Sequence, residues 1–465
     1  MRNYNQSTLA IAKTLEGIKQ DDADDWAQAV ATMGDIYETS WITIAATGSS
    51  SSQEGIYSTV PERYKARALR DHGFHVRENL PEFAEPFNPI HEYDSWPLLR
   101  RAWVYQERQL SPRMIHFSQH QIFWSCNSSF QSQDEWYSSR WDIRRKKSLE
   151  EWKSIVSEYS GLKLTYESDR LPAIAAIVLR AMQNRPGDTY IAGMWRDTLI
   201  PDLFWYTVNL QARPRSTYSI PTWSWASASG EIQYFIREQS FQQVAQLLDV
   251  TFTSIGMPHM GKVEDASITL QGPAYSLPKS TCSNFGESVA GTCWSDIDVR
   301  LTSDIRCTVY RDFDWQAVKP PIGPDHDLTV LFLCEELGDF ARVGQHFGGM
   351  ILKAVEADAF ERVGFVQIYP DPSKYGYPSD KESSDEECVE PAEDDEGGVD
   401  DEEIKDDNTA HKGAVYFSAT RPLLGAERVE IDDVDIEDES SGSDGDDHTV
   451  SSFVRALPVQ TFRIA

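Results

Sequence analysis

Four polar side chains within one short segment have the chemistry to act together on a ligand. Arg101, Gln106, Glu107 and Arg113 all lie in the stretch Pro97–Cys126. In one interpretation, Glu107 lies in a cleft at the carboxyl edge of an open α/β sheet and acts on a bound ligand, because such edges commonly hold sites. In the other, Arg101 pairs with a carboxylate, while Gln106 and Glu107 satisfy backbone groups at a sheet edge. The sequence leaves both interpretations open, and Glu107 is the candidate catalytic residue of the first.

A helix followed by a hairpin is expected to position these residues. Three- and four-residue spacing places one stripe of side chains on a single helix face: Leu99, Trp103, Gln106 and Leu110. We therefore expect Trp103 to be buried against the sheet. Residues 114–118 and 121–126, joined at Gln119 and His120, are typical of two hairpin strands.

Upstream residues predict the beginning of a parallel sheet. Carboxylates at positions 21–25 precede an apolar stripe from Trp26 to Tyr37, which indicates a helix with negative charge at its N-terminus. Trp41–Ala46 is a nearly continuous apolar run rich in β-branched residues, which favours a buried parallel strand. A serine-rich turn, Gly48–Gly55, follows. The order of helix, strand and loop predicts an α/β sheet of parallel type.

Downstream residues change from a helical to a strand pattern. Helical stripes cover residues 149–160 and 169–182. Trp223-Ser224-Trp225 has a period of two, which predicts a strand with both indoles in the core. Ser224 has no obvious partner base, so the sequence gives no support for a nucleophilic role. Beyond Gly230, alternating runs indicate antiparallel strands, which are expected to resume after the acidic insertion at residues 414–420 and 454–464.

Five stretches, in order along the chain, resemble the fungal heterokaryon incompatibility (HET) domain and the tryptophan-rich region that commonly follows it. They are residues 18–55, 97–126, 159–177, 190–205 and 221–227. The resemblance implies a role in non-self recognition and in cell death induced after fusion of unlike cells. It also implies a fold related to TIR domains, some of which cleave NAD+ through a catalytic glutamate. No TIR motif in this sequence can be aligned with that glutamate residue by residue. The assignment of the catalytic glutamate to Glu107 is therefore our hypothesis and is not carried over from the family.

The beginning of the chain departs from the family pattern. Members usually begin with a YxALSYxWG-like strand, followed later by a WIDALCIxQ-like strand. Here the resemblance starts at Ile18, and Met1–Gly17 resembles neither strand. We therefore expect a domain truncated at its N-terminus, with an incomplete ligand cleft and no detectable NAD+ turnover.

The sequence predicts a mixed α+β protein in four parts. An unmatched segment, 1–17, precedes a partial TIR-like α/β HET domain over 18–145. A Trp-rich helical connector over 146–245 leads to a β-rich C-terminal region over 246–465. That region contains an acidic insertion at about 376–411 and an acidic loop at about 430–450.

The net charge of −31 belongs mainly to two acidic tracts. Asp380–Asp407 holds 16 acidic residues against two lysines, and Glu430–Asp447 holds 10 with no Lys or Arg. Such runs cannot bury enough apolar surface to offset chain entropy, so we expect both to be disordered. They could serve as solubility tails or attract a basic partner. Direct nucleic-acid binding needs a field of the opposite sign, so we expect protein partners and no nucleic acid.

Several functional classes lack their sequence signals. No apolar run approaches the roughly 18 residues needed to span a bilayer, and no signal peptide is evident, so we expect an intracellular, cytoplasmic protein. The six cysteines form no CxxC pair, which favours buried free thiols over disulfides. We expect no metal, because His116 and His120, four residues apart on a hairpin, do not align as two ligands.

Two functions from different classes remain open. The first is a non-catalytic interaction module that signals by assembling with protein partners, and we favour it because the first strand is missing. The second is a TIR-like effector that hydrolyses NAD+, in which NAD+ is the substrate. Neither function requires a resident cofactor.

Overall fold

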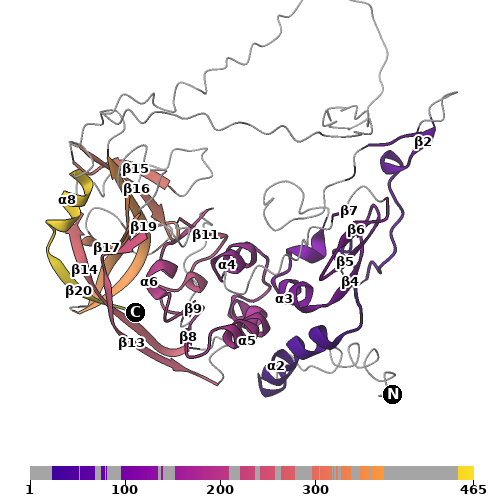
Figure 1. Ribbon diagram of the computed structural model, residues 1–465, viewed down its shortest axis with the longest axis horizontal. Coiled ribbons are helices and arrows are strands. Elements are labelled where there is room, and N and C mark those ends of the chain that lie inside the picture. The colour runs from indigo at the N-terminus through magenta and orange to yellow at the C-terminus, as the bar shows by residue number, and fades with distance from the viewer. Residues whose placement is uncertain are drawn as a thin grey trace, which may run out of the picture.

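The structure is a computed structural model of the full chain. It describes residues 23–51, 53–68, 75–78, 80, 96–134, 138–139, 152–208, 220–235, 241–256, 263–277, 296–302, 304–316, 318, 321–322, 326–336, 346–356, 358–370 and 449–465. Both acidic tracts, Met1–Gly17 and a strand expected at 414–420 lie outside these residues. Figure 1 shows a small sheet at one end, a large sheet at the other, and the tryptophan-rich helices between them.

The small sheet joins residues from two separate segments. Helix α2 (Ala23–Thr39) leads into β1, and the sheet consists of β1 (Thr43–Ala45), β4 (Arg113–Phe117), β5 (Ile122–Cys126), β6 (Phe130–Ser132) and β7 (Ser138–Ser139), in that spatial order. β1 runs parallel to β4, and the remaining neighbours are antiparallel. The expected hairpin is confirmed as β4 and β5. The expected parallel sheet reduces to one parallel pair, β1 and β4, among the described strands of this sheet.

Strand β1 lies at the edge of the described sheet. Trp41 is 75% exposed and Ile44 is 60% exposed, whereas Ala45 is buried. The prediction of a buried strand is therefore wrong. Among the described strands only β4 pairs with β1, so one side of its backbone and one of its faces lack the cover that a central strand receives.

The helix expected before the hairpin is interrupted at Arg101. A 3₁₀ helix, η3 (Pro97–Arg100), ends where Arg101 is extended with φ −86° and ψ 128°, and α3 (Ala102–Leu110) begins after it. Arg101 forms a β-bridge to Lys163. Trp103 is partly buried and packs against the helical residues Val30 and Ala175, which corrects its expected burial against the sheet.

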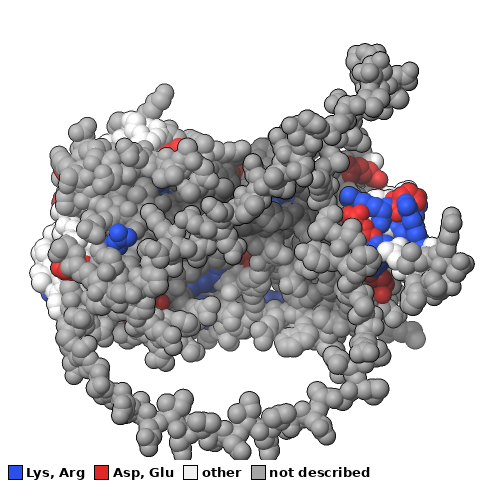
Figure 2. All heavy atoms as spheres, turned by 90° about the horizontal axis from the view of Figure 1, so that it is seen from above, with Lys and Arg blue, Asp and Glu red and all other residues white. Residues whose placement is uncertain are grey.

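Between β1 and η3 lies a segment that the structure describes in part. It contains η1 (Glu62–Tyr64), β2 (Arg67–Ala68) and β3 (His75–Val76). Figure 2 shows basic and acidic side chains together at the end of the molecule where Figure 1 places β2. Lys65 pairs with Glu62, and Arg77 pairs with Asp134, so the charges there are of mixed sign.

The tryptophan-rich part contains short strands as well as the expected helices. Its elements are α4 (Trp152–Ser160), η4 (Glu167–Asp169), η5 (Pro172–Ile174), α5 (Ala175–Asn184), β8 (Tyr190–Ile191), β9 (Met194–Trp195), α6 (Leu199–Asp202), β10 (Trp205–Thr207), η6 (Trp225–Ser227) and β11 (Ile232–Tyr234). The stripe on α4 is buried as its spacing predicts, with Trp152, Val156 and Tyr159 in the core.

The C-terminal part is rich in strands, as expected. One nine-stranded sheet contains β12 (Phe241–Gln243), β13 (Gln246–Ser254), β14 (Val263–Ser276), β15 (Asp296–Arg300), β16 (Ile305–Arg311), β17 (Leu328–Glu336), β18 (His346–Glu356), β19 (Ala359–Pro370) and β20 (Val459–Ile464). Pairings β17–β14–β20–β19–β18–β17 close a ring of five strands. Helix α8 (Thr449–Arg455) packs beside it and occupies the start of a segment expected to be a strand.

One hydrophobic core crosses the expected boundary at residues 245 and 246. It contains Tyr105 of α3, Trp205 of the tryptophan-rich part, and Leu331 and Phe365 of the large sheet. The connector and the large sheet therefore pack as one unit. None of the helices that the structure describes is both long and apolar enough to cross a membrane.

Candidate functional site

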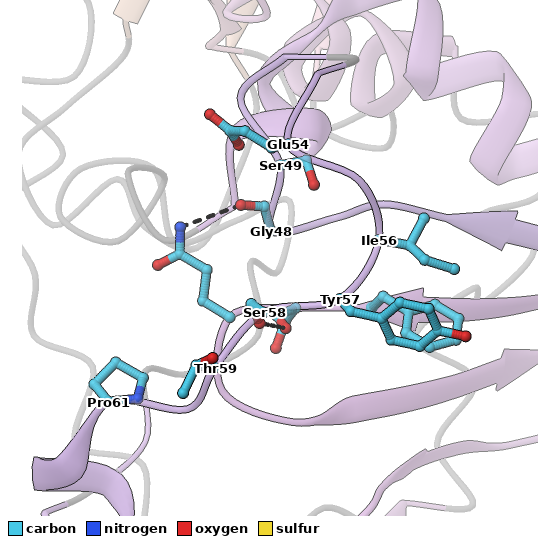
Figure 3. Close-up of a pocket in the computed structure, with 11 residues that line it drawn as sticks. Gly48, Ser49, Glu54, Ile56, Tyr57, Ser58, Thr59 and Pro61 are labelled. Carbon is cyan, nitrogen blue, oxygen red and sulfur yellow. Dashed lines mark hydrogen bonds between the residues drawn. The ribbon is translucent and has the colours of Figure 1, made fainter.

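A pocket of about 240 Å³ opens at the carboxyl ends of the parallel strands β1 and β4 (Figure 3). The turn after β1, the segment that follows it and the end of β4 line the pocket: Gly48, Ser49, Glu54, residues 56–59, Pro61 and residues 117–119. The carboxyl edge of parallel strands is the usual position of sites in open α/β sheets. The pocket is therefore the candidate functional site.

Gly48 allows the two strand ends to approach each other. Its N–H donates to the Phe117 carbonyl at 2.9 Å, and the Gln119 Nε2 donates to the Gly48 carbonyl at 3.1 Å. A Cβ atom at position 48 would lie only 2.6 Å from the Gln119 backbone nitrogen. A larger residue would push the two loops apart and reshape the floor of the pocket.

Several donors of the serine-rich turn are used by acceptors in or next to the turn. The Ser49 N–H donates to the Ala46 carbonyl at 3.0 Å, and the Ser50 N–H donates to Glu54 Oε2 at 2.7 Å. The Ser49 hydroxyl donates to the Gly55 carbonyl. This arrangement differs from a phosphate-binding loop, in which several backbone N–H groups point at the ligand.

Glu54 is the charged residue of the lining, and it is fully exposed to solvent. Hydrogen bonds from the Ser50 hydroxyl and backbone N–H lower the pKa of the Glu54 carboxyl below its ordinary value. The carboxylate is therefore ionised at neutral pH. At the rim, the Tyr57 ring is 83% exposed and meets Phe117 edge to face, with 5.8 Å between ring centroids.

Glu107 lies away from this pocket, toward the amino edge of the same strands. The Ser111 hydroxyl donates to the Glu107 carbonyl at 2.7 Å, and Ser111 Oγ lies 2.7 Å from Thr43 Oγ1 at the start of β1. Burial raises the pKa of the Glu107 carboxyl to about 7, against a hydrogen bond from Tyr37 and the charge of Arg101, which lower it. The cleft at the carboxyl edge is therefore lined by other residues.

The other three residues of the polar cluster have separate surroundings. Gln106 is fully buried, and its Oε1 accepts a hydrogen bond at 3.3 Å from the Ala176 N–H in the first turn of α5. It thus satisfies one of the N–H groups that a helix N-terminus leaves unpaired. Arg113 donates to the Trp41 carbonyl at 3.3 Å. Arg101 is exposed and acts on Glu107 through its charge.

The two hairpin histidines are both buried but differ in their partners. His116 lies between hydroxyls, with Nδ1 3.1 Å from Thr47 Oγ1 and Nε2 3.1 Å from Ser125 Oγ. Both ring nitrogens of His120 lack a hydrogen bond, and burial and the charge of Arg63 lower its pKa. Within the described ranges, no three His, Cys, Asp or Glu side chains are grouped to hold a metal ion.

The Trp223-Ser224-Trp225 motif is part of the core. Both indoles are fully buried, as expected, but η6 begins at Trp225 and the motif is no strand. The Ser224 hydroxyl donates to the Ala192 carbonyl at 2.5 Å and accepts from the Ala226 N–H at 3.1 Å. These bonds give Ser224 a turn-forming role.

Cys126 is a partly exposed thiol with a lowered pKa, a feature that the sequence did not indicate. It is partly exposed, whereas the free thiols of Cys307 and Cys334 are buried. Burial raises the pKa of the Cys126 thiol, but hydrogen bonds to Ser128 and Ser129 outweigh this effect and lower it to about 6.

The pocket was also missed as a site, although the glycine and serines directly after an apolar strand were its signal.

A comparison with known protein families finds a match for the part of the chain that contains the turn of the pocket. Residues 16–107 match the family described as "Heterokaryon incompatibility protein (HET)". The chain carries a heterokaryon incompatibility domain. The match covers α2, β1 and the turn Gly48–Gly55, and it ends at Glu107 within α3. Strands β4 and β5, which lie in the same sheet as β1, follow the matched residues. Neither a curated protein nor a solved structure matches the chain.

Proposed function

We propose that this HET-domain chain acts in fungal non-self recognition and cell death as a non-catalytic module that assembles with protein partners in the cytoplasm. The supporting observation is an apolar row across the outer face of the small sheet. Ile44 lies opposite Ile115, which lies opposite Trp124 on the next strand. Ile44 is 60% exposed, and Ile122 beside this row is 40% exposed. Grouped, exposed apolar side chains are informative because they commonly mark interaction surfaces.

The position of Glu107 further supports a non-catalytic role. Its carboxylate accepts a hydrogen bond from Tyr37 and lies outside the pocket lining. Among the described residues that line the pocket there is neither Lys nor Arg, and the Ser49 and Ser50 N–H groups are already donated to nearby acceptors. A dinucleotide carries a pyrophosphate, which is normally bound by such N–H groups or by basic side chains.

The test is substitution of Ile44 by Lys in the full chain, followed by measurement of cell death and of partner capture in fused cells. We expect both to be lost, because a charge in the row opposes burial against a partner. Leu248→Lys on β13 is the matched control, since Leu248 is 51% exposed in the large sheet. If Ile44→Lys still kills cells as strongly as the control variant, the proposal that the apolar row is an assembly surface is refuted.

TIR-like hydrolysis of NAD+ is the alternative function. The observation in its favour is the Glu107 carboxyl, whose pKa of about 7 suits proton transfer at neutral pH. An NAD+ consumption assay with the full chain and with Glu107→Gln distinguishes the two functions. Hydrolysis that disappears in Glu107→Gln while the fold is retained would establish the alternative. Killing without NAD+ loss, unchanged in Glu107→Gln, would support assembly.

A further inference from the structure

Several polar groups of the pocket at the carboxyl edge of β1 and β4 have already donated their protons and present acceptors to a ligand. The Gly48 N–H, the Ser49 N–H and the Ser49 hydroxyl are all donated to carbonyl groups. The Ser58 hydroxyl likewise donates to the Ser118 carbonyl at 3.0 Å. A hydroxyl that has donated its proton keeps lone pairs that accept. The polar capacity that remains on these groups therefore suits a ligand rich in donors.

The charge of the lining also favours a ligand that is rich in hydrogen-bond donors. Glu54 contributes a carboxylate, and no Lys or Arg is among the described residues of the lining. The basic residues in η1 and directly after it have partners of their own, since Lys65 pairs with Glu62 and the Arg63 guanidinium lies 4.7 Å from the centroid of the Tyr64 ring. The pocket therefore favours a cation and disfavours phosphate.

The size and apolar parts of the pocket limit the shape of that cation. A volume of about 240 Å³ is below the usual range for pockets that enclose drug-sized ligands. Glu54 stands at one end, and Ile56 and Tyr57 lie at another (Figure 3). A methylene chain can cover the Ile56 and Tyr57 side chains while its charged end reaches the carboxylate.

We propose that this pocket binds a linear alkyl-guanidinium or alkyl-ammonium group, with the cation on Glu54 and the alkyl stem along Ile56 and Tyr57. The group belongs either to a free small amine or to an Arg or Lys side chain of a protein. The binding does not depend on the apolar row proposed above for assembly.

Calorimetric titration of the full chain with agmatine tests the proposal, with a capped Gly-Arg-Gly peptide as the second probe and inorganic pyrophosphate as the anionic probe. We expect saturable binding of agmatine or the peptide that weakens with salt, and none of pyrophosphate. Glu54→Gln should weaken binding about threefold to tenfold, the effect of an exposed charge-assisted hydrogen bond. Tyr57→Ala should weaken it about threefold by removing stem contacts.

Glu264→Gln on β14 is the control, because it removes the same charge from an exposed position in the large sheet. Tighter binding of agmatine than of the peptide would identify a free amine as the source, and the reverse order a protein side chain. Equal affinity in Glu54→Gln and the wild type, binding of pyrophosphate in place of the cations, or no saturable binding would each overturn the proposal. Circular dichroism shows whether each variant is folded. Loss of killing in Ile44→Lys is scored separately, so the two proposals can fail independently.

Discussion

Opposing electrostatic effects meet at the Glu107 carboxyl. Burial favours its neutral form, whereas the Tyr37 hydroxyl and the Arg101 charge favour the carboxylate. Burial is the larger effect, so the pKa rises from the ordinary 4.5 to about 7. The folded chain therefore holds this proton over a pH range in which the unfolded chain has lost it.

Glu107→Gln should remove one component of the pH dependence of stability. With the folded pKa above the unfolded one, the contribution is complete below pH 4.5 and is lost as the pH rises to about 7. The shift corresponds to at most about 3 kcal/mol. Urea unfolding at pH 4.5 and pH 8 should therefore show a smaller difference in Glu107→Gln than in the wild type. Glu264→Gln, an exposed control, should keep the wild-type difference, and an unchanged difference in Glu107→Gln would contradict the assigned pKa.

Among the elements, the turn between β8 and β9 organises the tryptophan-rich part. The Nε1 groups of Trp152 and Trp225 both donate to the Gly193 carbonyl, at 2.9 and 2.7 Å. Ala192 has φ +48° and Gly193 has φ +99°, so the turn is left-handed at both positions. A hairpin turn of two residues requires such positive φ values.

Gly193→Ala should destabilise the fold far more than Gly187→Ala. Both glycines have positive φ, at +99° and +92°, so both substitutions incur the left-handed penalty of about 1–2 kcal/mol. At Gly193 the new Cβ would also lie 3.0 Å from Trp225 Nε1, whereas at Gly187 nothing lies within 4 Å. We expect Gly193→Ala to cost about 2 kcal/mol more, measured by chemical unfolding. Equal losses would show that the indoles yield easily.

Local patterns predict elements whose contacts are local. Periodicity was sufficient for α4 and for the β4–β5 hairpin, because one face of each is buried. It failed at Arg101, whose extended backbone depends on a bridge to Lys163, far along the chain. It also failed at Trp225, because alternation could not reveal that the indole donates to Gly193. Gln106 accepts a hydrogen bond from α5, whereas Glu107 accepts one from Tyr37 of α2. Both contacts join segments that are distant in the sequence, so local periodicity could not predict them.

Across the whole molecule, Arg362 joins the tryptophan-rich part to the large sheet. Its side chain is fully buried and donates to the carbonyls of Leu203 at 2.7 Å and Trp205 at 2.6 Å. It also pairs with buried Asp312 at 3.2 Å, and its guanidinium lies 3.5 Å from the centroid of the Trp205 ring. One guanidinium thus satisfies groups from α6, β10 and the end of β16, so these parts should unfold together.

Arg362→Met should destabilise the chain by about 3–5 kcal/mol, because it leaves the Asp312 carboxylate buried without its cation. Lys353→Met on the neighbouring β18 is the control. The Lys353–Glu361 pair is 23% and 27% exposed, so its loss should cost less than about 1 kcal/mol. Because 12 of the 14 tryptophans precede residue 230, tryptophan fluorescence reports mainly on the chain before the large sheet, and circular dichroism reports on the strands. In the wild type both signals should change at one urea concentration, and in Arg362→Met that concentration should be lower. Two separate transitions in the wild type would mean that the shared core fails to couple the two parts, and the loss in Arg362→Met would then appear mainly in the part that holds Asp312.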